Sequence, residues 1–165
     1  MTELHPIPRS SRGVTLVELM VAIAVLGILV TFGAPGMQQL INGQRASSSA
    51  NEVLSGLALA RTEAIKRNTT IGFCMSATNR QWEVRAGGTT TGTANTTVFR
   101  QGDLSNTITA TSANTSTVSG FNCVDYRSDG LPYSGTNLVT NGSFSLTSGN
   151  VTRNVRIRTG SIYVD

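Results

Sequence analysis

Glu18 is the one charged residue in an apolar run that extends from Val14 to Ala34. A carboxylate at the centre of a bilayer costs about 2.5 to 3.5 kcal/mol on insertion scales, and less near the end of a span. The run contains no basic residue that could neutralise Glu18. A new α-amine could do so if the chain were cut between Gly13 and Val14, either within one chain or between neighbouring copies. Pairing between copies would neutralise both charges and set the axial register of stacked subunits.

The apolar run has the length and the flanks of a membrane span. As a helix, its 21 residues reach about 30 Å, which matches the hydrocarbon layer of a bilayer. Arg9 and Arg12 precede it and the next basic residue is Arg45, so the positive-inside rule predicts a cytoplasmic N-terminus and an exported remainder. A cleaved secretory signal is the alternative, because "FGA" at 32–34 loosely resembles a cleavage site. Proline is poorly tolerated after such a cut, and Pro35 therefore favours retention.

The remaining residue types offer little for catalysis or metal binding. His5 is the single histidine, and a cut after Gly13 would remove it, so Ser/His/Asp and Cys/His sites are unavailable to the mature chain. Two cysteines without histidine do not form an ordinary zinc shell. The segment "GGTTTG" (87–92) lacks the lysine and helix of a phosphate-binding loop. We therefore expect no enzyme activity, no cofactor and no metal.

Cys74 and Cys123 are the only thiols, and both lie in strand-like segments beyond the apolar run. In an exported domain such a pair predicts one disulfide. A bridge between them would close a loop of 49 residues, which chain entropy values at roughly 4 kcal/mol. Two buried free thiols are the alternative.

Helical spacing continues beyond the apolar run and must position the rest of the chain. The helix is expected to run to Arg67, where Asn68 ends it, and to kink at Pro35, which Gly33 and Gly36 flank. One apolar stripe faces a core. It consists of Val53, Leu57, Ala60 and Ala64.

After residue 68 the hydrophobic pattern alternates with a period of two, which predicts short strands. The candidate strands are "TIGFCM" (70–75), "QWEVRA" (81–86), "TTVFRQ" (96–101), "TVSGFNCV" (117–124), "SFSL" (143–146), "NVRIR" (154–158) and "SIYVD" (161–165). Two hairpin turns are expected, at Asn141-Gly142 between "NLVT" (137–140) and "SFSL", and at Thr159-Gly160. Residues 87–120, rich in Thr, Asn, Ser and Gly, are expected to form a loop that contains a strand or two.

The segment "RGVTLVEL" (12–19) resembles the class III signal of type IV pilins and type II secretion pseudopilins. It has a basic leader, Gly13 before the cut, a hydrophobic first residue Val14, and Glu18 as the fifth mature residue. The resemblance implies that a prepilin peptidase cleaves after Gly13 and N-methylates Val14 at the cytoplasmic face. The first mature residue of such proteins is commonly Phe, so Val14 is a mild departure. Pro35 falls at mature position 22, where pilin helices often carry proline.

Three further segments resemble the GspH/FimT family: "SGLALARTEAIKRNTTIGFCMS" (55–76), "YRSDGLPYSG" (126–135) and "VRIRTGSIYV" (155–164). The fold that this implies is α+β, with a long N-terminal hydrophobic helix packed on a small antiparallel β-sandwich head. The expected segments are a cytoplasmic leader (1–13), a membrane and assembly helix (14–35), a head-packing helix (36–67) and a periplasmic head (68–165).

The function that the resemblance implies is a minor type IV pilin, FimT- or FimU-like, that leaves the inner membrane for a pilus and primes assembly at or near the tip. Its partners would be the prepilin peptidase and other major and minor pilins or pseudopilins. A GspH-type minor pseudopilin of the type II secretion system is the alternative. An ordinary anchored domain, with Glu18 at the headgroups, would not explain the spacing of Gly13, Thr15, Leu16 and Glu18.

Some FimT-type proteins bind DNA through a C-terminal "GRxR" motif, but the matching place here reads "GSIY" (160–163) and lacks both arginines. The preceding segment alternates Arg156 and Arg158 with apolar residues, and Arg153 is expected to extend this patch. Three arginines could contact phosphates without reading bases. The interpretation that we favour over DNA binding is a solvated strand face or salt bridges to one of three acids, Asp125, Asp129 and Asp165.

Overall fold

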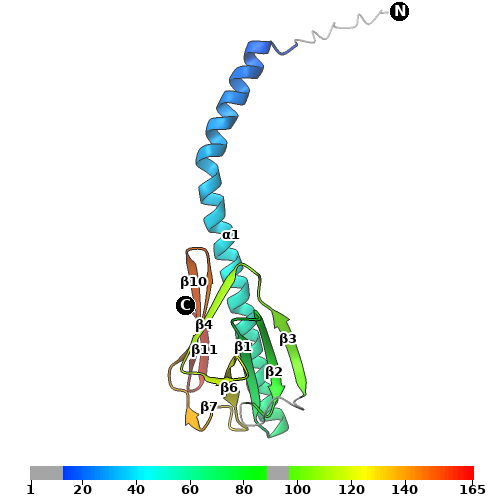
Figure 1. Ribbon diagram of the computed structural model, residues 1–165, viewed down its shortest axis with the longest axis vertical. Coiled ribbons are helices and arrows are strands. Elements are labelled where there is room, and N and C mark those ends of the chain that lie inside the picture. Colours follow the sequence, from blue (N-terminus) through cyan, green and yellow to red (C-terminus); the bar gives the residue numbers. More distant parts are fainter. Residues whose placement is uncertain (1–12, 89–96) are drawn as a thin grey trace, which may run out of the picture. The chain divides into compact units, whose positions relative to one another are not determined.

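The structure, a computed structural model, describes residues 13–88 and 97–165, except for the side chains of residues 32–35. The expected leader and part of the 87–120 segment therefore lie outside the described residues. The chain divides into two compact units, Met1–Gln38 and Gln39–Asp165. Helix α1 (Leu16–Arg67) begins in the first unit and ends in the second, and all strands belong to the second (Figure 1).

The described strands follow α1 in the order of the chain. They are β1 (Ile71–Ser76), β2 (Gln81–Ala86), β3 (Val98–Asp103), β4 (Ile108–Ala113), β5 (Ser116–Val118), β6 (Phe121–Tyr126), β7 (Pro132–Ser134), β8 (Asn137–Leu138), β9 (Gly142–Ser148), β10 (Val151–Arg158) and β11 (Ser161–Val164). Every pairing among them is antiparallel. Sheet A has the order β3-β2-β1-β6-β7-β8 with β5 also paired to β6, and sheet B has the order β11-β10-β9-β4.

Local capping explains where α1 ends. Asn68 adopts a φ of 51°, the left-handed conformation that asparagine tolerates better than most residues. Its N–H donates to the carbonyl of Ile65 at 3.3 Å, and the N–H of Thr69 donates to the carbonyl of Ala64 at 3.2 Å. These two bonds form a Schellman motif, which satisfies the last carbonyls of the helix. The predicted helix end at Asn68 is confirmed.

Among the described residues, no single helix qualifies as a membrane span by length and apolarity. The consecutive parts Leu16–Thr31 and Gly36–Arg67 of α1 qualify only when they are taken together. The side chain of Pro35 lies outside the described residues, so the kink that the sequence predicts there stays a prediction.

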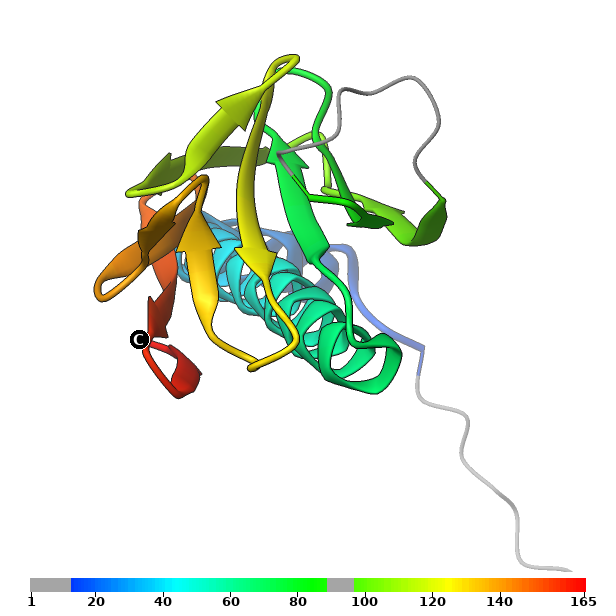
Figure 2. The same ribbon diagram turned by 90° about the horizontal axis from the view of Figure 1, so that it is seen from below.

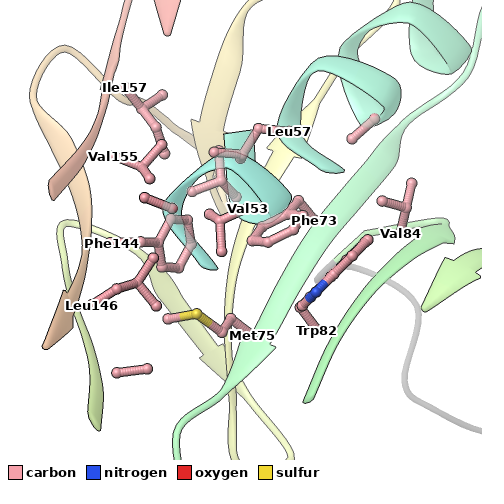
Figure 3. Packing of buried hydrophobic residues seen from close by; sticks show 14 of the residues in the cluster. Val53, Leu57, Phe73, Met75, Trp82, Val84, Phe144, Leu146, Val155 and Ile157 are labelled. Carbon is pink, nitrogen blue, oxygen red and sulfur yellow. The ribbon is translucent and has the colours of Figure 1, made fainter. Parts of the chain in front are cut away.

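The second part of α1 packs into the core of the head through small and medium side chains. The predicted stripe is confirmed and longer than expected. Its fully buried members are Ala46, Ala50, Val53, Leu57, Ala60 and Ala64. In Figure 3, Val53 lies between Phe144 of sheet B and Phe73 of sheet A. The two rings meet edge to face with their centroids 5.3 Å apart, so side chains of both sheets and of the helix form one core.

Gly56 of α1 is required by the close approach of two aromatic rings. A Cβ at this position would lie 2.6 Å from Cε2 of Phe73 and 3.1 Å from Cζ3 of Trp82. The absence of a side chain lets β1 and β2 approach the helix closely. Phe73 and Trp82, whose ring centroids are 5.8 Å apart, fill this space.

Strand β1 is central to sheet A and is buried along its whole length. Its register with β6 places Cys74 directly opposite Cys123. The two residues form a disulfide and are fully buried. The predicted bridge is therefore confirmed, and the alternative of two free thiols is wrong.

Six of the seven predicted strands are present as single strands. The segment 117–124, predicted as one strand, is instead a hairpin of β5 and β6, and Ser119 and Gly120 adopt positive φ in the turn between them. The segment 87–120, expected to hold a strand or two, contains β3, β4 and β5.

One of the two predicted hairpins is also wrong. The turn at Thr159-Gly160 joins β10 to β11 and is confirmed. Asn141-Gly142 does not join a pair, because β8 pairs with β7 while β9 pairs with β4 and β10. Neither residue has the positive φ that a primed hairpin turn requires. The chain instead crosses from sheet A to sheet B here, and Val139 is buried in the core on the way.

Candidate functional site

The peptide bond between Gly13 and Val14 lies just before the first turn of α1. Both residues are exposed and have no regular secondary structure, and the helix begins at Leu16. The exposed fraction of Val14 is 72%, and no heavy atom lies within 4 Å of where a Cβ of Gly13 would be. A protease must bind its substrate in an unwound form, and this segment is already unwound.

Thr15 caps the start of the helix, and Glu18 lies in its first turn. The N–H of Glu18 donates to Oγ1 of Thr15 at 3.3 Å, and the N–H of Leu19 donates to the carbonyl of Thr15 at 3.1 Å. Thr15 is therefore the N-cap, and Glu18 occupies the third helical position, as in a capping box. The carboxylate of Glu18 also lies in the first turn, where the positive end of the helix dipole favours an acid.

Glu18 has no basic partner within the described part of the chain. The ion pairs there join Arg67 to Glu63, Arg85 to Glu83 and Arg156 to Asp165. The Thr15 cap was not predicted, although the pattern Thr-x-x-Glu before an apolar run is the sequence signal for it. One helix start thus carries the candidate cleavage bond, the cap and the single acid of the apolar run.

The first part of α1 is apolar on every side, and its large side chains are not buried against any other part of the described chain. Its exposed large side chains are Leu16, Val17, Leu19, Met20, Val21, Ile23, Val25, Leu26, Ile28, Leu29 and Val30. A helix with no polar face is stable in lipid or among other apolar helices.

On β10, Arg156 and Arg158 alternate with Val155 and Ile157, which are fully buried. This part of the predicted arrangement is confirmed. Nε of Arg156 lies 2.8 Å from Oδ2 of Asp165, and the hydrogen bond from Arg156 is the main cause that lowers the pKa of the Asp165 carboxyl. The favoured interpretation of the sequence, a salt bridge to Asp165, therefore holds for Arg156.

Arg153 does not extend the patch, and that prediction is wrong. It lies an even number of residues from Val155 and therefore projects to the same side of the strand. Its Nε donates to Oγ of Ser47 on α1 at 3.4 Å. Arg153 thus ties sheet B to the helix and does not share a surface with Arg158.

The metal-ligating residue types do not cluster in the part of the chain that the structure describes. No group of three or more His, Cys, Asp or Glu residues there could hold a metal ion. A surface hollow of about 340 Å³ lies between residues 137–141, Asn114 and Ser134, and none of these side chains titrates.

Two family models match the chain, one over most of the head and one over the N-terminal segment. The family model of the type II transport protein GspH matches residues 49–161. The model of the prokaryotic N-terminal methylation motif matches residues 8–34. A curated relative, type II secretion system protein H of Xanthomonas campestris pv. campestris, is 29% identical over 90 residues. That match covers 51% of this chain and 53% of the relative, so the chain spans about half the length of this relative.

Two solved structures share the fold. The minor pseudopilin EpsH from the type 2 secretion system of Vibrio cholerae has a TM-score of 0.55 at 14% identity, over 73% of this chain and 96% of that one. The type IV minor pilin FimU of Pseudomonas aeruginosa has a TM-score of 0.56 at 17% identity, over 74% of this chain and 89% of that one. The α+β class with a helix on an antiparallel head, which the sequence resemblance implied, is thereby confirmed.

Proposed function

Because this chain belongs to the GspH family, we propose that it is a minor subunit of a pilus-type filament. The apolar part of α1 holds it in the inner membrane as a single pass before assembly, with the head in the periplasm. The observation that carries this proposal is the helix start, where an exposed Gly13-Val14 bond, the Thr15 cap and Glu18 precede a helix that is apolar on every side. The disulfide supports an oxidising compartment for the head.

Processing is the first step of the proposed function. A prepilin peptidase cuts after Gly13 and methylates the new amine of Val14. The match of the N-terminal methylation motif to residues 8–34 supports this step, as does the unwound state of residues 13–15. Mass spectrometry of the membrane-extracted protein tests it directly. We expect methyl-valine at residue 14, and a chain that still begins at Met1 contradicts the proposal.

Glu18 then binds the amine of Val14 in a neighbouring subunit. The absence of a basic partner in the described chain and the apolar surroundings favour such a pair, because each charge is costly in lipid on its own. The match between acid and amine sets the register of one helix against the next.

Two machines build filaments of this kind, the type IV pilus and the type II secretion system. The sequence resemblance favours a pilus in which this subunit primes assembly at or near the tip. The family model and the curated relative favour secretion, while the FimU likeness is compatible with both. Deletion of the gene in its host separates the two. Loss of surface pili and twitching assigns the pilus, and accumulation of secreted enzymes in the periplasm assigns the secretion system.

A second function in DNA binding gains no support from the arginines of β10. Arg153 bonds to Ser47 and Arg156 pairs with Asp165, which leaves Arg158 as the one unpaired member. A single arginine is a weak basis for phosphate binding.

A further inference from the structure

Three segments that are distant in the sequence meet at the last two turns of α1. Nη1 of Arg61 donates to the carbonyl of Gly160, in the turn between β10 and β11, at 3.2 Å. A Cβ on Gly130, in the loop between β6 and β7, would lie 2.8 Å from Cδ1 of Ile65 and 3.4 Å from Nε of Arg61. Figure 2, seen from below, shows the loop (yellow) beside the end of the helix and the turn (red) on the outer side of that loop.

We call this region the helix-end surface. Its side chains are Arg61, Ile65, Lys66, Arg127, Asp129, Tyr133, Arg158 and Tyr163. Arg67 lies outside it, with its guanidinium over the ring of Phe99 on β3. The region holds four basic residues and one acidic residue, whereas the rest of residues 39–165 holds seven basic and six acidic residues. Most of the positive surplus of the head therefore lies at one place.

The one acid of the helix-end surface is already engaged. The carboxylate of Asp129 accepts the N–H of Leu131 at 2.8 Å and the hydroxyl of Tyr133 at 3.3 Å. Four cations remain without a carboxylate within 4.0 Å in the described part of the chain. They are Arg61, Lys66, Arg127 and Arg158.

Two of these cations are held in place by aromatic rings. The guanidinium of Arg127 lies 3.7 Å from the ring centroid of Tyr133 and donates to the carbonyl of Gly135 at 3.4 Å. The guanidinium of Arg158 lies 6.0 Å from the ring centroid of Tyr163. Both contacts are within the range of cation–π attraction. Side chains that are ordered before binding lose less entropy when a partner arrives.

An exposed apolar residue accompanies the basic side chains. Ile65 is 52% exposed and Tyr163 is 38% exposed, and they are two of the few large apolar side chains of the head that remain at the surface. An apolar centre with Arg and Tyr around it is the composition of a protein interface. A phosphate backbone would gain nothing by covering Ile65, so the surface fits a polypeptide better than a nucleic acid.

We propose that the helix-end surface docks a segment of another subunit of the same filament that carries carboxylates next to an apolar side chain. This inference rests on the proposed function and adds to it the place and the chemistry of one contact. The carboxylates meet Lys66, Arg127 and Arg158, and the apolar side chain covers Ile65. Electrostatic attraction sets the choice of partner, and burial of Ile65 supplies affinity.

The test is photo-crosslinking in the native host, with the full-length chain carrying a crosslinking amino acid at position 65. The matched control carries it at Asn150, which is exposed and lies at the opposite end of β10. We expect a crosslink from position 65, but not from 150, to a peptide of another filament subunit that contains Asp or Glu. The double substitution Lys66→Glu plus Arg158→Glu should weaken this crosslink by about tenfold, because like charges then oppose each other. Neither side chain has a hydrogen bond to the rest of the described chain, so the fold is retained.

Controls separate charge from folding and this inference from the proposed function. Arg45→Glu makes the same kind of change on an exposed helical site elsewhere in the head and should leave the crosslink unchanged. A urea unfolding midpoint equal to that of the wild type, followed by the fluorescence of Trp82, verifies that each variant is folded. Substitution of Lys for the Asp or Glu of the partner should restore the crosslink to the double variant, because opposite charges then face each other again.

Several outcomes overturn the inference. The inference is wrong if position 65 gives no crosslink, or if the double substitution leaves the crosslink yield unchanged. It is also wrong if nuclease digestion removes the crosslinked partner, which would then be a nucleic acid, or if the partner is not a filament subunit. If the wild-type chain forms no complex with other pilins or pseudopilins in the host, the proposed function fails. If such complexes form but position 65 does not crosslink, only the docking inference fails.

Discussion

The two parts of α1 are continuous in the chain but differ in what surrounds them. From Leu16 to Val30 the large apolar side chains are exposed on every side, whereas the second part buries one stripe, such as Leu57, against two sheets. The head therefore has its own core, while the first part has none among the described residues. Under the proposed function, lipid or other subunits stabilise the first part, so that folding of the head and assembly depend on different parts of one helix.

The largest effect should follow from loss of the single acid in the first part. Glu18→Ala removes the charge that we propose pairs with a neighbouring amine, so incorporation into the filament should be abolished while cleavage after Gly13 continues. Immunodetection of the subunit in sheared filaments and in membranes measures both. Normal incorporation of this variant contradicts the role that we assign to Glu18.

Matched leucines on the two parts of the helix test the comparison most directly. Leu57→Ala leaves a cavity in the core and should destabilise the head by about 2 to 5 kcal/mol. Leu26 is 59% exposed, so Leu26→Ala should leave the unfolding of the head unchanged. Urea unfolding of the full chain in detergent, followed by the fluorescence of Trp82, the single tryptophan, gives both values. Equal destabilisation by the two variants would show that the parts do not fold separately.

A pair of glycines makes a finer test within the second part. Gly56→Ala forces two rings to move, at a cost of about 1 to 3 kcal/mol, which the helix propensity of alanine offsets by up to about 1 kcal/mol. We expect a net destabilisation of about 1 kcal/mol. Gly43→Ala meets no heavy atom within 4 Å and should be neutral or slightly stabilising in the same urea titration. A stabilised Gly56→Ala variant would contradict the close packing of Phe73 and Trp82.

The smallest effect concerns the exposed pair of Arg156 and Asp165. The folded pKa of Asp165 is lowered, chiefly by the hydrogen bond from Arg156. The pair therefore adds stability above the unfolded pKa of an aspartate and loses it as the pH falls through the lowered value. Asp165→Asn should reduce the unfolding midpoint slightly at neutral pH and not at all in strong acid. Added salt should reduce the difference, as for other surface pairs.

Strands with clear alternation could be predicted from the sequence, and β4 could not. In "ITATSA" the buried positions are Ile108 and Ala110, and alanine among threonines gives little contrast. The false hairpin at Asn141-Gly142 has a similar cause. A turn-forming dipeptide also suits a crossing between sheets, and only the burial of Val139 decides between the two.

The position of a site side chain could be predicted from the sequence where a single strand or a single helix start determines that position. The alternation of side chains along a strand places Arg156 and Arg158 correctly on the face opposite Val155 and Ile157. The same alternation places Arg153 on the face of Val155, so its position was also predictable. The pattern of Thr15 and Glu18 also indicated the cap. The helix-end surface could not be predicted, because Arg61, Arg127 and Arg158 come together only through the contacts of Gly130 and Gly160 with the helix.

The disulfide has a mechanical consequence if the chain works in a filament. A filament that retracts or drags a load pulls on its subunits through their helices, and the tension passes from α1 across Asn68 into β1. Cys74 lies six residues beyond Asn68 and is bonded covalently to Cys123 on β6. Tension that reaches Cys74 passes through the covalent bond to Cys123, so the backbone between the two cysteines, which holds β2, β3, β4 and β5, would not be extended by it.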